Sequence, residues 1–255
     1  MANFVDGTKF KRISGQLVHV PIGKVVKIGL WGGMETSGHL LDVDPDDATV
    51  LKSARAPKHG SIFMFVLTGL NLGETTLNAV AADGSSWDSV DIHVHMPRKK
   101  QLPAWDDLFD NYAGDAEASD DFRTRIGGDV DNSQFSNTCT LRMSEAFNGA
   151  GQPIPKNHPG LYTVLGGDKK NYALRVAEFK QFMLSTYGAP DIVRTPPAGS
   201  PTGVLRADFA HLRGVMCFEV HFADATGHFT LWDGTQPVHG DYFSRSYRVS
   251  LWVAG

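Results

Sequence analysis

Hydrophobic residues in the first 97 positions occur in short runs rich in β-branched and aromatic side chains, and the last run alternates apolar with polar residues. The runs cover residues 18–30, 61–67, 75–81 and 89–95, and Gly, Asp, Asn and Pro residues separate them. β-branched and aromatic side chains fit a half-buried pleated surface, and the separating residues favour turns. The pattern predicts an all-β module over residues 1–97.

The pattern changes after a basic segment, Pro97-Arg-Lys-Lys100. An acidic stretch from Trp105 to about Asp121 follows it, and its composition and spacing predict a helix. We therefore expect a domain boundary here, with one domain over residues 1–97 and a second over residues 98–255.

A later helix, predicted near residues 137–150, carries the first candidate for chemistry. Asn137 is its expected N-cap, and Cys139 falls on its first turn. The buried face of this helix is expected to consist of Leu141, Met143, Ala146 and Phe147. Unpaired N–H groups and the helix dipole favour a thiolate at this end, but by only about 0.3–1 kcal/mol. That is less than about one pKa unit, so a reactive thiol also requires a histidine beside it.

The best histidine candidate is His228, which opens the second of two strands predicted within residues 213–234. A polar turn at residues 223–227 joins these strands, and Asp233-Gly234 predicts a turn into a third strand. On that third strand His239 and Asp241 would share one face. A cysteine on a helix, a histidine on a strand and a polar residue on the next strand are typical of a thiol hydrolase.

Several spaced blocks carry a family resemblance. From about residue 101 onward, the sequence resembles type VI secretion amidase effector family 4, whose members are peptidoglycan amidases of papain-like, NlpC-type fold. The resemblance rests on the blocks at residues 126–128, 135–144, 148–151, 175–179, 187–191 and 227–234. It implies an α+β fold for residues 98–255, with Cys139 as the catalytic nucleophile and His228 as the catalytic base.

The third catalytic residue departs from the family pattern, in which an aspartate usually stands between two close cysteines. This chain instead has Pro237-Val-His-Gly-Asp241, without either cysteine. Counting from His228 without gaps places His239 at the aspartate position, and we favour it. Asp241 would serve if a bulge shifted the register.

The resemblance also implies what the enzyme cuts and how it travels. The expected substrate is the peptidoglycan stem peptide, cleaved between D-glutamate and meso-diaminopimelate. The expected partners are a cognate immunity protein and components of the type VI secretion system. The N-terminus lacks the pattern of a secretory signal, which leaves intracellular storage with release by lysis or direct injection by a contractile secretion machine. The resemblance favours injection and action in the periplasm of target bacteria.

Composition narrows the function classes further. The 255 residues carry a formal net charge of −4, which gives no support for a nucleic-acid partner. No stretch approaches a transmembrane span. Asp91, His93 and His95 share one predicted strand face, but they cannot close a metal shell alone. We therefore expect no metal site and no cofactor.

Three further residues allow two interpretations each. Arg142 lies one turn after Cys139 and would either contact a substrate carboxylate or pair with Glu145. Trp232 shares a strand face with His228 and would either wall the cleft or pack in the core. Cys217, in an apolar strand, is expected to be a buried structural thiol, although a disulfide with Cys139 is the alternative.

Two rival functions remain open from the sequence. One is a housekeeping cell-wall hydrolase with the same chemistry, and the other is a non-enzymatic cell-wall-binding or delivery protein. Residues 1–97 resemble bacterial immunoglobulin-like domains, and this resemblance implies no catalytic role. It leaves three alternatives for the module: targeting to the cell wall, loading onto the injection apparatus, or modulation of the catalytic domain.

Overall fold

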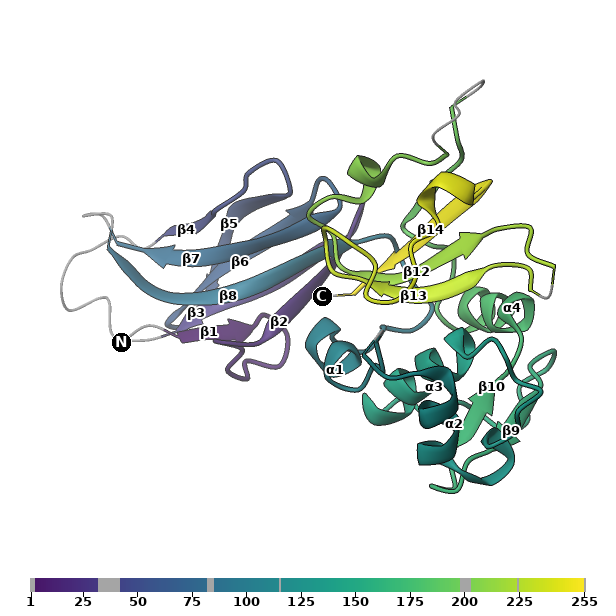
Figure 1. Ribbon diagram of the computed structural model, residues 1–255. Coiled ribbons are helices and arrows are strands. Elements are labelled where there is room, and N and C mark those ends of the chain that lie inside the picture. The colour runs from purple at the N-terminus through teal and green to yellow at the C-terminus, as the bar shows by residue number, and fades with distance from the viewer. Residues whose placement is uncertain are drawn as a thin grey trace. The chain divides into compact units, whose positions relative to one another are not determined.

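The computed structural model describes residues 3–31, 42–81, 85–114, 116–197, 203–223 and 225–254 (Figure 1). The chain divides into two compact units, Met1–Pro97 (unit 1) and Arg98–Gly255 (unit 2). The division lies at the basic segment that follows the last strand of unit 1. Within the described residues, no helix has the length and apolar character needed to cross a membrane.

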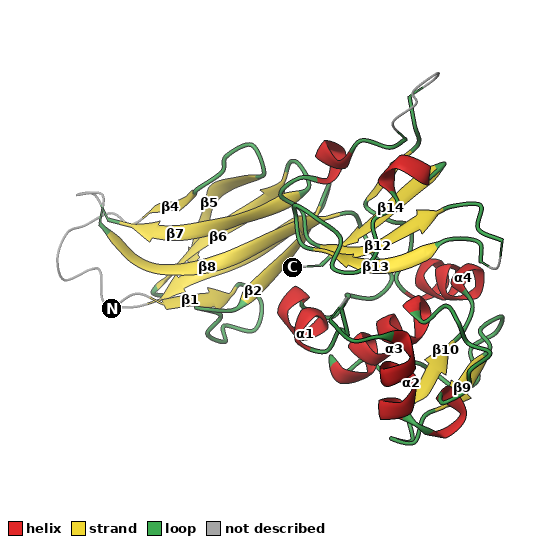
Figure 2. Cartoon of the chain, in the orientation of Figure 1, coloured by secondary structure: helices red, strands yellow, loops and turns green. Residues whose placement is uncertain are grey.

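Unit 1 is built from strands, as Figure 2 shows. Its described residues form β1 (Asn3–Asp6), β2 (Leu17–Pro21), β3 (Val25–Trp31), β4 (Asp42–Pro45), β5 (Leu51–His59), β6 (Ile62–Gly69), β7 (Gly73–Val80) and β8 (Ser86–His95). One sheet has the order β1-β3-β6-β5 and the other β2-β8-β7-β4, with β2 and β8 parallel. Apolar side chains of both sheets, such as Phe65 and Ile92, form one core. Unit 1 is therefore a two-sheet β structure.

The strands of unit 1 are more numerous than the hydrophobic runs predicted. The run at residues 18–30 covers most of β2 and of β3, which are separated by a turn in which Gly23 has φ +72°. The polar strand β5 was not predicted, because most of its residues are solvent-exposed and lack an apolar face. The likeness to immunoglobulin-like domains stays a prediction.

Unit 2 packs helices against an antiparallel sheet. Its helices are α1 (Trp105–Asp110), α2 (Ser119–Ile126), α3 (Cys139–Gly149) and α4 (Val176–Thr186), with short 3₁₀ turns η1 (Gly128–Val130), η2 (Arg206–Phe209) and η3 (Phe243–Arg245). Its strands are β9 (Thr163–Leu165), β10 (Asn171–Ala173), β11 (Ile192–Arg194), β12 (Gly214–Glu219), β13 (His228–Trp232) and β14 (Arg248–Val253). The main sheet has the order β11-β14-β12-β13, and β9 pairs with β10. The fold of unit 2 is thus mixed α+β.

The core of unit 2 joins α3 and α4 to the main sheet. Phe147 of α3 packs edge-on against Phe179 of α4, and Phe179 in turn packs against Phe229 of β13. Cys139 and Cys217 belong to the same buried cluster. The apolar spacing predicted for α3 therefore places the start of this helix beside the start of β13.

Two predicted elements of unit 2 differ from the structure. The acidic stretch from Trp105 to about Asp121 contains α1 and the start of α2 rather than one helix. The buried Arg142 side chain donates hydrogen bonds to the carbonyl oxygens of Ala113, Gly114 and Glu117, which lie between the two helices. The third strand predicted after Asp233-Gly234 is also wrong, because residues 238–241 form a loop and the next strand is β14.

Candidate active site

Cys139 is the first residue of α3, and its side chain is buried. Thr138, rather than the predicted Asn137, occupies the N-cap position. The side chain of Asn137 nevertheless satisfies the helix start, because its Oδ1 accepts a hydrogen bond from the Cys139 backbone N–H at 3.1 Å. The Cys139 sulfur accepts a backbone hydrogen bond from Phe229. The sulfur therefore lies beside the peptide group that joins His228 to Phe229.

His228 opens β13 as predicted, and its side chain is 4% exposed. Its Nε2 lies 2.9 Å from the backbone carbonyl oxygen of His239 and 3.3 Å from His239 Nδ1. A carbonyl oxygen can only accept, so this contact assigns the proton to Nε2 of His228. Within the described residues, Nδ1 of His228 makes no hydrogen bond. The nitrogen that carries a free lone pair is therefore Nδ1.

Burial keeps both reacting groups neutral at pH 7. Desolvation raises the pKa of the Cys139 thiol to about 11, and the backbone N–H groups around the sulfur offset only part of this. Desolvation, followed by the nearby His239 ring, lowers the pKa of His228 to about 4. The helix start therefore does not produce a thiolate in the free protein, because burial outweighs the effect of about 0.3–1 kcal/mol.

The loop after β13 brings His239, but not Asp241, to His228. The rings of His239 and His228 stack with centroids 5.1 Å apart. The Thr230 hydroxyl accepts a hydrogen bond from the His239 backbone N–H at 2.9 Å, which fixes the position of the loop. Thr230 lies two residues after His228 on the same strand face, so one strand positions both the imidazole and the group that contacts it.

Gly240 explains why the predicted alternation of His239 and Asp241 fails. Its φ of +64° is left-handed, so the chain turns here instead of continuing as a strand. A Cβ at this position would lie 3.0 Å from His228 Nε2 and 2.8 Å from the Tyr242 ring. Asp241 is directed to an ion pair with Arg206 and accepts a hydrogen bond from the Phe243 backbone N–H. His239 and Asp241 therefore do not share a face.

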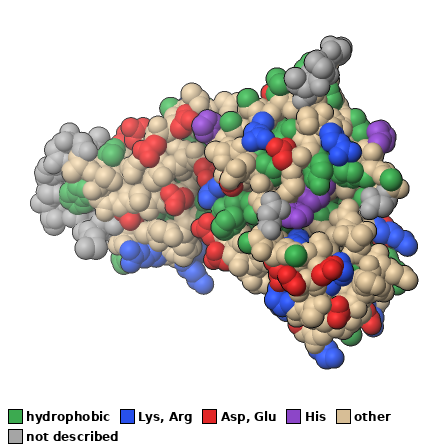
Figure 3. Space-filling view, viewed as in Figure 1, with side chains coloured by type: hydrophobic (Ala, Val, Ile, Leu, Met, Phe, Trp, Pro, Cys, Tyr) green, Lys and Arg blue, Asp and Glu red, His purple; other side chains and the backbone are tan. Residues whose placement is uncertain are grey.

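A pocket of about 260 Å³ opens onto this site. Its walls consist of Ser119, Ser136, Asn137, Thr138, Phe222, His228, His239 and Tyr242. The Tyr242 ring lies 4.9 Å from the His228 ring. In the view of Figure 3, histidine and hydrophobic side chains lie next to one another on the surface of unit 2. The pocket is thus lined by both polar side chains and aromatic rings.

Arg142 does not line this pocket. Its side chain is 1% exposed, and its guanidinium donates to three backbone carbonyls and to the Thr138 hydroxyl. Glu145, the alternative partner predicted for Arg142, forms an ion pair with Arg125. The burial favours a structural role, in which Arg142 ties the segment between α1 and α2 to the start of α3.

Trp232 is fully buried in the core on the same side of β13 as His228. Its Nε1 donates to the Phe209 carbonyl oxygen at 2.8 Å, and its ring packs against Phe209 and Phe243. This placement favours packing in the core over a position in the wall of the cleft. Cys217 is also buried, and both cysteines are free thiols, so no disulfide joins it to Cys139.

Sequence reasoning missed the roles of Thr230, Gly240 and Tyr242. Gly240 carried the one available signal, since a glycine between two polar residues is compatible with a turn as well as with a strand. The contact of Thr230 with His239 depends on the loop conformation and has no local sequence signature.

Comparison with known families links this geometry to one of them. Residues 135–252 match the family model described as type VI secretion system (T6SS), amidase effector protein 4, abbreviated Tae4. The matched segment lies within unit 2 and includes Cys139, His228 and His239. No curated protein sequence matches the chain.

Three solved structures show the same similarity. The effector Tae4 from Salmonella typhimurium, in complex with the immunity protein Tai4 from Enterobacter cloacae, is 26% identical over 60% of this chain and 100% of its own, with a TM-score of 0.55. The Tae4–Tai4 complex from Enterobacter cloacae is 29% identical over 61% of this chain and 100% of its own, with a TM-score of 0.54. The Tae4 effector from Enterobacter cloacae alone is 29% identical over 63% of this chain and 99% of its own, with a TM-score of 0.53.

Proposed function

We propose that unit 2 is a cysteine-dependent peptidoglycan amidase of the type VI secretion amidase effector 4 family. The observation that carries the proposal is the family match over residues 135–252, which contains a cysteine at a helix start and a buried histidine beside it. The papain-like, NlpC-type description of the fold belongs to the same proposal. It is supported by the order of these elements, a helix that presents the thiol followed by a strand that presents the base.

In this mechanism the resting pair is a neutral thiol and a neutral imidazole. As the Cys139 sulfur attacks the substrate carbonyl carbon, Nδ1 of His228 takes the thiol proton. The resulting imidazolium gives this proton to the amide nitrogen, so the amine leaves and a thioester remains. A water molecule, deprotonated by the same imidazole, then attacks the thioester and releases the acid and the free thiol.

The Nε2–H of His228 stays bonded to residue 239 throughout this cycle. Its hydrogen bond to the His239 carbonyl oxygen fixes the tautomer in which Nδ1 is the base. When the imidazole becomes cationic, the carbonyl dipole of His239 stabilises the charge. We therefore assign the third position to His239, acting through both its backbone and its ring, in preference to Asp241.

The oxyanion is proposed to be held at the start of α3. The backbone N–H groups of Cys139 and Thr140, in the first turn of this helix, already point toward the sulfur. A carbonyl oxygen placed there during attack would gain negative charge near the positive end of the helix dipole.

The proposed substrate bond joins D-glutamate to meso-diaminopimelate in the stem peptide, which is what the family resemblance implies. The pocket of about 260 Å³ suits a short peptide segment rather than a large ring system. Injection by a type VI secretion system, action in the periplasm of a target bacterium, and inhibition by a cognate immunity protein complete the proposal. The last part is supported by the solved Tae4–Tai4 complexes.

The test is mass spectrometry of purified Gram-negative peptidoglycan after incubation with the full chain. Wild type and Cys217→Ala are expected to release fragments ending in D-glutamate, whereas Cys139→Ala and His228→Ala release none. Because Cys217 is an equally buried cysteine, it controls for the loss of a core thiol.

Two outcomes would contradict the proposal. If folded, reduced wild type leaves every stem peptide intact while the protein sediments with the wall, the non-enzymatic binding function is the better account. If Cys139→Ala cleaves as fast as wild type, the cysteine is not the nucleophile.

A further inference from the structure

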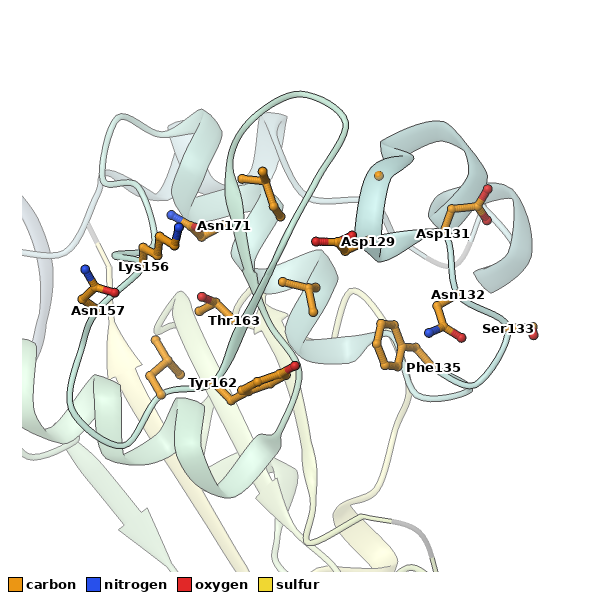
Figure 4. Close-up of a pocket in the computed structure, with 14 residues that line it drawn as sticks. Asp129, Asp131, Asn132, Ser133, Phe135, Lys156, Asn157, Tyr162, Thr163 and Asn171 are labelled. Atoms are coloured by element: carbon orange, nitrogen blue, oxygen red, sulfur yellow. The ribbon is translucent and has the colours of Figure 1, made fainter.

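A second cavity of unit 2, of about 950 Å³, lies outside the catalytic pocket. One wall is the segment from Gly128 to Phe135, and the other is the segment from residue 156 to Leu165. In Figure 4 the Asp129 carboxylate and the Phe135 ring point toward Thr163 and Tyr162 across the cavity. The proposed reaction uses none of these side chains, so the cavity requires a separate explanation.

The lining of this cavity offers many hydrogen-bonding groups and little net charge. Carboxylates, primary amides, hydroxyls and one ammonium surround the space, contributed by Asp129, Asp131, Asn132, Ser133, Lys156, Asn157, Thr163 and Asn171. The two carboxylates disfavour a phosphate or a nucleic acid, and the polar lining disfavours an apolar ligand. The lining therefore suits a neutral, highly hydroxylated molecule.

Two of the amides are held in a fixed orientation. The Asn132 Oδ1 accepts from the Gln134 backbone N–H at 3.0 Å, which leaves its amino group available as a donor. The Asn171 Nδ2 donates to the Ile154 carbonyl oxygen at 3.1 Å, which leaves its Oδ1 available as an acceptor. Within the described part of the chain, Asp129 and Asn157 make no side-chain hydrogen bond or ion pair. The cavity thus has oriented groups with capacity for a ligand.

Tyr162 adds an exposed aromatic ring on a rigid support. Tyr162 is 55% exposed to solvent. The Arg175 guanidinium covers one face, 5.5 Å from the ring centroid. Glu178 holds both partners, because it pairs with Arg175 at 2.8 Å and accepts the Tyr162 backbone N–H at 2.8 Å. These contacts hold the Tyr162 backbone and place a guanidinium on one face of its ring, which leaves the other face for a ligand.

From this combination we infer that the cavity binds the sugar chain of the substrate, made of N-acetylated amino sugars. A pyranose ring has an apolar face of C–H groups that stacks on an aromatic ring such as Tyr162. Its equatorial hydroxyl and acetamido groups match the amides and carboxylates of the walls. The inference rests on the proposed function for the identity of the polymer and extends it to the glycan.

The chain itself connects this glycan site to the catalytic pocket. Phe135 lines the cavity, and the next three residues, Ser136 to Thr138, line the catalytic pocket just before Cys139. A substrate whose stem peptide is covalently attached to sugar would therefore occupy two neighbouring sites. Binding of the glycan would raise the effective concentration of the peptide at Cys139.

The test uses the inactive Cys139→Ala full chain and the soluble sugar tri-N-acetylchitotriose, followed by backbone amide NMR. We expect saturable shifts confined to residues 128–135, 156–165 and 171. Tyr162→Ala should weaken this binding roughly fivefold, the usual effect of losing one stacking contact. Tyr247→Ala is the matched control, because Tyr247 is also exposed and also has one covered face, against His221.

A kinetic measurement gives the same inference a second readout. In the active chain, Tyr162→Ala should raise KM for a disaccharide-linked stem peptide and leave KM for the free stem peptide unchanged. Tyr247→Ala should change neither value.

The outcomes separate this inference from the proposed function. Absence of shifts in these residues at millimolar sugar, or equal binding by Tyr162→Ala, would overturn the glycan site even if wild type cleaves the peptide. A free stem peptide that shifts these residues when the sugar does not would assign the cavity to peptide and also overturn it. Sugar binding by a chain that cleaves nothing would uphold the glycan site and reject the amidase.

Discussion

The two cysteines of this protein show what distinguishes a candidate nucleophile from a structural thiol. Cys139 and Cys217 are both free, both buried and part of the same hydrophobic cluster. Burial raises the pKa of both thiols. Cys217, however, lies in the middle of β12, where its neighbours use their backbone groups for strand pairing. Cys139 starts a helix, and backbone N–H groups of Phe229 and Thr140 point at its sulfur.

The comparison shows that burial alone does not identify a reactive cysteine. The difference lies in which groups surround the sulfur when negative charge develops on it. At Cys139 these are N–H dipoles and a pocket that contains the neutral base His228. The residues that pair with Cys217 on the neighbouring strands are Phe229 of β13 and Ser250 of β14, and neither is a comparable base.

The largest difference in activity should appear when each of the two cysteines is replaced by alanine in turn. Cys139→Ala is expected to lower kcat/KM on peptidoglycan fragments by about 10⁴-fold or more, because no other nucleophile replaces the sulfur. Cys217→Ala should keep kcat/KM within about twofold while losing roughly 1 kcal/mol of unfolding free energy through the lost core contact. Steady-state assays and urea unfolding measure the two quantities. Equal activity losses in both variants would remove the distinction.

Gly240→Ala should have the next largest effect. The added Cβ would crowd the Nε2 of His228 at 3.0 Å, and φ +64° is strained for alanine. We expect roughly a 10²-fold loss of kcat from the displaced imidazole and about 1–2 kcal/mol of lost stability. Gly15→Ala is a control for strain alone, since Gly15 has φ +70° and an added Cβ would meet nothing within 4 Å. A Gly240→Ala enzyme with full activity would contradict the proposed position of His228.

The pH dependence of kcat/KM should reflect a neutral resting pair. The imidazole must be neutral to accept the thiol proton, and burial lowers its pKa from 6.5 to about 4. Activity should therefore persist as pH falls through 6.5 and then drop about tenfold per unit below pH 4. On the alkaline side, no change is expected near 8.5, because burial raises the pKa of Cys139 to about 11. An acid limb near 6.5, in protein that circular dichroism shows to be folded, would mean that His228 is solvated.

The smallest effects separate His239 from Asp241. His239→Ala should lower kcat by about tenfold, because the ring beside His228 is lost while the backbone carbonyl that accepts its Nε2–H remains. Asp241→Asn should change kcat less than about threefold, since its carboxylate pairs with Arg206 on the exposed side of the loop. A larger loss in Asp241→Asn than in His239→Ala would reverse the assignment of the third residue.

Local patterns predicted the elements that present the reacting groups. The apolar spacing after Asn137 predicted α3, and the alternation after His228 predicted β13. Both depend on short-range periodicity, which sequence alone can show. The mixed α+β fold of unit 2 and its similarity to the amidase effectors agree with the resemblance noted from the spaced blocks.

Features that depend on contacts between distant segments were not predictable in this way. The path of residues 238–241 is set by the left-handed Gly240 and by Thr230, and the alternation rule therefore gave the wrong face for Asp241. Arg142 points into the protein because carbonyl groups of a segment more than 20 residues earlier accept its hydrogen bonds. The glycan cavity joins two segments, at residues 128–135 and 156–165, whose proximity no local pattern reveals.

The most direct test of the central claim is the site of thiol alkylation. Folded wild type is treated with limiting iodoacetamide, the two cysteine-containing peptides are quantified by mass spectrometry, and peptidoglycan cleavage is measured in parallel. The account predicts that Cys139 is modified before Cys217, that activity falls in proportion to Cys139 modification, and that His228→Ala slows the modification. Preferential modification of Cys217, or full activity after Cys139 is completely alkylated, would contradict it.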